Sequence, residues 1–314
     1  MTSGCGYAWL CYHHSMGFRH QMRQAVNRWL KTRRLYLERR PGDFTDPEML
    51  PPEFFSRRIP CEEIAFRDEA QVRWLEEDVL PRQEQFSTWA IHEDDATPAG
   101  YFLANRYFGP VDAETYFCVI QERRPARIIE VGSGHSTRVA RHAIKEGGTR
   151  SHLTCIDPDP RVSVAGLADE HWRQTVQSVP VSRFEALKAH DILFIDSSHR
   201  LEIGGDLPFL YLEVLPRLAE GVLVHIHDIY LPRHYPQYWV QVECRGYNEQ
   251  YAVALMLARN RMWEVLWASQ WMLEHHRERV EEVFPNIQRV KNAFPDNRDI
   301  PASPGSLWLK KTCS

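Results

Sequence analysis

The stretch IIEVGSGHST, residues 128–137, decides the fold of this chain of 314 residues. An apolar run that holds one acid passes through two glycines into a helical pattern, which continues from Arg138 to Lys145. Glycines in such a turn let a ligand approach the backbone closely, and the start of the helix offers free N–H groups. We therefore expect a buried strand, a ligand-binding turn and a helix in immediate succession.

Short apolar runs alternate with helical stretches from Asp112 onward, a pattern typical of a parallel sheet flanked by helices. Their continuous apolar character indicates strands that are buried on both faces. The predicted strands are 127–131, 153–156, 192–195 and 222–226, with later ones near 264–267 and 306–309. The predicted fold class is α/β: a Rossmann-like, doubly wound, mostly parallel sheet with helices on both faces.

The first third of the chain lacks this alternation. A helix is predicted over 19–39, where Pro41-Gly42 ends it, and a second helix over 67–77. We expect two parts: an N-terminal helical and irregular extension, residues 1–104, and a domain that contains the sheet, residues 105–314.

The composition excludes several classes of partner. With 42 acidic and 38 basic side chains, the chain has no excess of cations for a phosphate backbone, so a nucleic acid is not expected. No apolar run reaches the roughly 20 residues that cross a bilayer, and residues 1–20 lack the apolar stretch of a signal peptide. The expected location is therefore cytoplasmic, without a membrane partner. A homodimer stays open.

A second acid supports a nucleoside-binding site. Asp157 directly follows the strand 153–156, where it can accept hydrogen bonds from ribose hydroxyls, as the corresponding acid does in dinucleotide-binding folds. Thr137 stands where the dinucleotide motif G-x-G-x-x-G has its third glycine. This departure favours S-adenosylmethionine over NAD as the cofactor.

Polar side chains also follow two other predicted strands. Asp196 comes after the strand 192–195, and His227 and Asp228 come after the strand 222–226. Ligands of open parallel sheets bind beyond the carboxyl ends of the strands, so these side chains can converge on one divalent cation. Carboxylates favour Mg²⁺ or Ca²⁺, and added imidazole permits Mn²⁺, Fe²⁺ or Zn²⁺. His225 lies deeper in its strand and is expected to be a hydrogen-bonded core histidine.

The glycine turn resembles motif I of class I S-adenosylmethionine-dependent methyltransferases, and Asp157 is similar to their ribose-binding acid. By this resemblance, the residues that bind the cofactor are Glu130, Gly132, Ser133, Gly134, Ser136, Asp157 and Asp196. Ser136 stands where that motif commonly has a third glycine. Residues 105–314 also look like a bacterial, uncharacterised branch of this class.

The strand-end acids resemble the metal ligands of catechol-type, cation-dependent O-methyltransferases. The resemblance implies Asp196, His227 and Asp228 as ligands, although that family usually has an acid followed by an acid or amide where His227-Asp228 stand. It also implies His199, three residues after Asp196, as the general base, with both residues catalytic.

The expected function is methyl transfer from S-adenosylmethionine to a hydroxyl of a small molecule or glycan, assisted by a divalent cation. Three alternatives stay open. The first is metal-independent N- or O-methylation, and the second is a non-catalytic protein that retains the fold. The third is an iron-dependent oxidative enzyme, although no double-stranded β-helix pattern surrounds the histidines.

Overall fold

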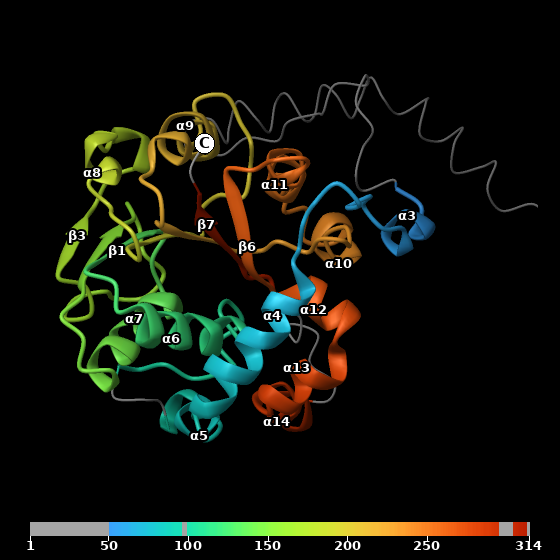
Figure 1. The fold of residues 1–314 in the computed structure, drawn as a ribbon, viewed down its shortest axis with the longest axis horizontal. Helices are drawn as coiled ribbons and strands as arrows, with labels where there is room; N and C mark the ends of the chain where they lie inside the picture. The colour runs from blue at the N-terminus through green and yellow to red at the C-terminus, as the bar shows by residue number, and fades with distance from the viewer. Residues whose placement is uncertain (1–49, 96–98, 295–303, 313–314) are drawn as a thin grey trace, which may run out of the picture. The chain divides into compact units, whose positions relative to one another are not determined.

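The computed structural model describes residues 50–95, 99–294 and 304–312, and the helix predicted over 19–39 lies outside them. Residues Pro51–Ser314 form one compact unit (Figure 1). Among the described residues, no helix is both long and apolar enough to span a membrane.

A sheet of seven strands in the order β3-β2-β1-β4-β5-β7-β6 organises this unit. Only β7 runs antiparallel to its neighbours β5 and β6. The strands are β1 Arg127–Val131, β2 His152–Ile156, β3 Glu170–Trp172, β4 Ile192–Ile195, β5 Leu223–Ile226, β6 Trp263–Ala268 and β7 Leu307–Lys311. The predicted mostly parallel sheet is therefore confirmed. The short edge strand β3 was not predicted, because its three residues form no apolar run.

Strand β1 lies where the strand order reverses, since it pairs with β2 on one side and with β4 on the other. Val131, the last residue of β1, is in register with Ile156 of β2 and Ile195 of β4. The segments that follow these three strands therefore start side by side. In open α/β sheets, ligands bind in the crevice at such a switch point.

Helices cover both faces of the sheet (Figure 1). The α-helices are α3 Pro52–Ser56, α4 Asp68–Trp74, α5 Gln83–Phe86, α6 Asp112–Arg123, α7 His135–Glu146, α8 Ser182–Glu185, α9 Asp206–Phe209, α10 Gln237–Gln241, α11 Glu249–Leu257, α12 Ser269–His275, α13 Arg277–Val283 and α14 Asn286–Ala293. Along β1, Ile128 packs toward α6 and α7, whereas Ile129 and Val131 pack with the core on the side of α8, α9 and α11. This alternation follows from the two-residue period of a strand.

The segment before residue 105 shares the core of the sheet's helical layer. The predicted helix 67–77 is present as α4, which continues as a π-helical turn over Leu75–Val79. Leu75, Phe86 and Tyr101 are fully buried in the same apolar cluster as the inner sides of α6 and α7. The domain boundary expected at residue 104 stays a prediction.

Candidate functional site

A cavity of about 630 Å³ opens at the carboxyl ends of β1, β2, β4 and β5. This size lies within the range typical of small-molecule sites. The turn after β1 and Asp157 after β2 line one part of it. The segments after β4 and β5, the start of α6 and residues 304–305 line the rest. The cavity thus lies at the switch point of the sheet.

A glycine is required at position 132 because the ends of β1 and β4 approach each other closely there. Its φ is +84°, and a Cβ atom at this position would lie 1.8 Å from the carbonyl oxygen of Asp196. Gly134 faces open space instead, since a Cβ atom there would meet nothing within 4 Å. The turn therefore presents bare backbone to the cavity, as a closely approaching ligand requires.

Asp157 is fixed at the cavity wall by two backbone groups. Its Oδ2 accepts a hydrogen bond from the Ser133 N–H (2.9 Å), and its Oδ1 accepts one from the Asp159 N–H (2.8 Å). Each carboxylate oxygen retains a second lone pair. The geometry is compatible with the ribose contact expected from the sequence.

Glu130 lies beneath the turn and is absent from the residues that line the cavity. It is fully buried and accepts hydrogen bonds from Thr137 Oγ1 (2.6 Å) and Tyr116 Oη (3.1 Å). The pKa of this carboxyl is raised to about 7, because the effect of burial exceeds the opposing effect of these hydrogen bonds. Thr137 in turn accepts the Gly134 N–H (3.1 Å), so Glu130 braces the turn from inside rather than touching the cavity.

His135, which follows the turn and begins α7, is a buried residue at the cavity wall. Its ring lines the cavity, and its Nδ1 is buried without a hydrogen-bond partner among the described residues. Burial, helped by the Arg138 charge, lowers the pKa of His135 to about 4, so the ring is neutral. Ser136 beside it also lines the wall.

The strand ends after β4 and β5 bring four ionisable side chains together. His199 Nε2 lies 3.1 Å from Asp196 Oδ1, and His227 Nδ1 lies 3.4 Å from the same oxygen. The Asp228 carboxylate lies 3.6 Å from each of these two nitrogens. One ligand atom from each of Asp196, His199 and His227 falls within 4.8 Å of the others, close enough to hold one metal ion. The structure thus joins the predicted set of Asp196, His227 and Asp228 and adds His199 to it.

A buried carboxylate holds the outer nitrogen of His199. Its Nδ1 lies 2.8 Å from Oε2 of Glu249, which begins α11 and is fully buried. The other oxygen of Glu249 accepts a hydrogen bond from Tyr211 Oη (2.7 Å). Asn248, which precedes α11, accepts the Leu201 N–H through its side chain and so binds the loop after β4 rather than capping the helix.

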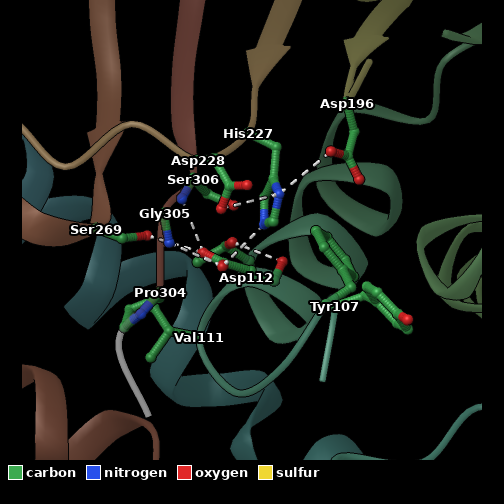
Figure 2. Close-up of polar contacts among 12 residues, drawn as sticks. Tyr107, Val111, Asp112, Asp196, His227, Asp228, Ser269, Pro304, Gly305 and Ser306 are labelled. Atoms are coloured by element: carbon green, nitrogen blue, oxygen red, sulfur yellow. Dashed lines mark hydrogen bonds and ion pairs between the residues drawn. The ribbon is translucent and has the colours of Figure 1, made fainter. Parts of the chain in front are cut away.

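A second buried carboxylate holds the outer nitrogen of His227. Its Nε2 lies 3.3 Å from Oδ2 of Asp112, the first residue of α6, and Figure 2 shows the imidazole between Asp112 and Asp196. The sequence did not identify Asp112, because no predicted strand precedes it and it is far from His227 in the chain. His225, two residues earlier, is a buried core histidine bonded to Ser306 Oγ (2.8 Å), as expected.

The charges of the cluster favour protonated imidazoles in the absence of a cation. Burial alone would lower the pKa of His199 and of His227, but the surrounding carboxylates hold both pKa values well above the ordinary range. Burial alone would raise the pKa of Asp196, but the two imidazoles hold it well below its ordinary value. Burial raises the pKa of Asp228.

Aromatic side chains form the outer wall of the cavity. Tyr230, Trp239 and Tyr247 line it, and they belong to the segment between β5 and α11. The short helix α10 interrupts this segment. The Arg245 guanidinium also lines the cavity and stacks 3.8 Å from the centroid of the Trp239 ring.

Comparison with solved structures finds methyltransferases of low sequence identity. An O-methyltransferase from Bacillus cereus bound to SAH is 11% identical, with a TM-score of 0.37 over 76% of this chain and 90% of that one. The plantazolicin methyltransferase BpumL bound to SAH is 13% identical, with a TM-score of 0.34 over 78% and 95%. A Podospora anserina methyltransferase bound to SAH is 10% identical, with a TM-score of 0.32 over 82% and 90%. No curated protein sequence matches the chain.

Comparison with family models matches residues 129–229 to a methyltransferase domain. The matched span starts inside β1 and ends one residue after Asp228, so it contains the glycine turn, Asp157 and the cluster after β4 and β5. The segment that carries both parts of the cavity is therefore similar to a methyltransferase domain.

Proposed function

We propose that this methyltransferase methylates a hydroxyl group of a small molecule or glycan, with a divalent cation that binds the acceptor oxygen. One observation carries the proposal. His199 and His227 each have one nitrogen held by a buried carboxylate and the other directed at Asp196. Histidines that bind metals typically donate their second N–H to a carboxylate in this way.

The donor set fits a divalent cation of intermediate softness. Asp196, His199 and His227 would hold the ion, with the Asp228 carboxylate close enough to join them. Two imidazoles beside two carboxylates suit Mn²⁺, Fe²⁺ or Zn²⁺ better than Mg²⁺, which prefers oxygen ligands. A bound cation would acidify the acceptor hydroxyl and orient its oxygen.

His199 is proposed as a ligand in place of the general-base role expected from the sequence. A general base must be unprotonated at the working pH. The carboxylates around His199 hold its pKa well above the ordinary range, so without a cation the ring stays protonated and cannot accept a proton. The metal-independent alternative, in which Asp196 and His199 orient the nucleophile, is tested by the metal titration below.

The cofactor half of the site uses mainly backbone and one acid. The turn over Gly132, Ser133 and Gly134 would receive S-adenosylmethionine, with Ser136 on the wall and Asp157 at the ribose. Glu130 would act indirectly by bracing this turn. Because the sulfonium is already an activated methyl donor, the protein contributes mainly proximity and orientation for in-line attack.

The acceptor would occupy the part of the cavity between the cluster and the aromatic wall. The cofactor and the acceptor must share about 630 Å³, which favours a small molecule or the end of a glycan. Tyr230, Trp239 and Tyr247 would pack on its apolar surface, and Asp196 borders both halves.

Titration of chelator-treated protein with Mn²⁺ and, separately, with S-adenosylhomocysteine tests both halves of the site. We expect the wild type to bind both ligands and Asp196→Asn to lose most of its affinity for Mn²⁺. Asp159→Asn is the matched control, because Asp159 lines the cavity but lies outside the cluster. If the wild type binds S-adenosylhomocysteine but no Mn²⁺, Zn²⁺ or Fe²⁺, the cation is refuted and metal-independent methylation replaces it.

A further inference from the structure

We propose that Asp112 is a positioning residue for the cation site: it fixes the tautomer of His227 so that Nδ1 presents its lone pair to the metal. The inference rests on the proposed function, since it assigns a cause to the orientation of one proposed ligand. Neither the glycine turn nor the strand-end pattern points to Asp112, which begins α6.

The Asp112 carboxylate accepts at four positions. Oδ1 accepts the Ser306 N–H (2.9 Å) and the Ser269 hydroxyl (3.2 Å). Oδ2 accepts the Gly305 N–H (2.9 Å) and faces His227 Nε2 at 3.3 Å (Figure 2). A carboxylate has about four lone-pair sites, and the four donors, which come from three parts of the chain, use all of them. Because the side chain is only 5% exposed, water does not compete for these sites.

This arrangement determines which nitrogen of His227 carries the proton. Because Asp112 Oδ2 acts as an acceptor, His227 Nε2 must be the donor. A neutral imidazole carries only one N–H, so its Nδ1 then has a free lone pair. That nitrogen is the one directed at Asp196 (3.4 Å) and Asp228 (3.6 Å).

The backbone before Asp112 is held in a costly conformation. Val111 has φ 72° and ψ −52°, close to the strained γ-turn that a β-branched residue rarely adopts. The Val111 N–H donates to the buried carboxylate of Glu114, which stabilises this turn. Strain of this kind persists where the surrounding structure requires it, typically at functional sites. Here it accompanies the placement of Asp112 at the edge of the cavity.

The segment that donates to Asp112 is fixed against the second strand end. A Cβ atom on Gly305 would lie 2.9 Å from the Asp228 Cα, and the Ile229 N–H donates to the Gly305 carbonyl (2.9 Å). Asp112 therefore joins the start of α6, the segment before β7 and the end of β5 around His227. A residue that only stabilises the fold would make the same contacts. The test must therefore measure the affinity for the metal and the tautomer of His227.

The decisive variant is Asp112→Asn, which keeps the size and one acceptor oxygen. Its amide N–H₂ can donate to His227 Nε2, which leaves the imidazole proton on Nδ1, where it blocks metal binding. Asp191→Asn is the matched control: Asp191 is equally buried and accepts the backbone N–H groups of Arg127 (2.8 Å) and Lys188 (2.9 Å), far from the cluster.

Calorimetric titration with Mn²⁺ should show affinity lower by about 10- to 100-fold in Asp112→Asn and unchanged in Asp191→Asn, with S-adenosylhomocysteine binding retained by both. Equal Mn²⁺ affinity in Asp112→Asn and wild type overturns the proposal. It is also overturned if Asp112→Asn loses S-adenosylhomocysteine binding while its Mn²⁺ affinity is unchanged. If the wild type binds no cation, the proposed cation site fails and this inference fails with it.

A measurement on the wild type keeps the proposal falsifiable if Asp112→Asn does not fold. In protein loaded with Zn²⁺, side-chain ¹⁵N spectra should show His227 protonated at Nε2 and metal-bound at Nδ1, with the signals assigned through His227→Gln. A proton on Nδ1 of the Zn²⁺-loaded wild type overturns the inference.

Discussion

Glu130→Gln tests the electrostatic cost of the acid beneath the glycine turn. The buried carboxyl has its pKa raised from 4.5 to about 7, chiefly by burial. The unfolded chain releases this proton near pH 4.5, whereas the folded protein keeps it until about pH 7. Between these values the folded state binds more protons, so the contribution of Glu130 to stability falls as the pH rises.

The size of the effect follows from the shift. Each unit of pKa difference corresponds to about 1.4 kcal/mol, so the ionised carboxylate destabilises the folded state by about 3 kcal/mol above pH 7 relative to acid conditions. Glutamine resembles the neutral acid and can still accept the Thr137 hydroxyl. We therefore expect the difference in the free energy of unfolding between Glu130→Gln and wild type to shift by about 3 kcal/mol in favour of the variant as the pH rises from 4.5 to 8.

Urea unfolding of the cofactor-free protein across this pH range measures the difference between variant and wild type. The burial of Glu114 likewise raises its pKa to about 7, but this residue is present in both proteins, so its contribution cancels. Glu146→Gln removes an acid from an exposed position at the end of the same helix, α7, and is the control. A difference for Glu130→Gln that stays constant with pH would refute the reasoning.

Two further variants probe the two halves of the cavity. Gly132→Ala places a Cβ atom 1.8 Å from the Asp196 carbonyl oxygen at a φ of +84°, so we expect a loss of more than about 2 kcal/mol in stability and no calorimetric binding of S-adenosylhomocysteine. Retained binding would contradict the proposed role of the bare turn. Tyr211→Phe removes the donor to the buried Glu249 carboxylate, so urea unfolding should show a loss of about 1–3 kcal/mol and calorimetry a weaker Mn²⁺ affinity. Unchanged Mn²⁺ affinity would show that the orientation of His199 does not depend on this support.

The fold was predictable because the central strands are short, mostly apolar runs. The segments 127–131 and 192–195 coincide with β1 and β4, and the predicted β5 differs by one residue. Such runs are required where helices cover both faces of a sheet. The edge strand β3 is exposed on part of its surface and needs no such run, so the sequence held no signal for it.

The residues of the site were predictable only where a strand end places them. Asp196, His227 and Asp228 meet because parallel strands bring their carboxyl ends to one edge. Asp112 and Glu249 begin helices, and each reaches its histidine across a tertiary contact that no local pattern encodes. The sequence therefore indicated the proposed ligands, whereas the carboxylates that hold their outer nitrogens emerged from the structure.

His199 shows why its role depends on tertiary structure rather than on its position after β4. Its φ of 56° is in the left-handed region, which costs roughly 1 kcal/mol for a residue other than glycine. Its carbonyl accepts the backbone N–H groups of Asn248 (2.9 Å) and Glu249 (3.3 Å) at the start of α11, and the Glu249 side chain holds its ring. One helix start thus fixes both the backbone and the imidazole. This double restraint holds the imidazole in one orientation, as the proposed role of a metal ligand requires before the ion arrives.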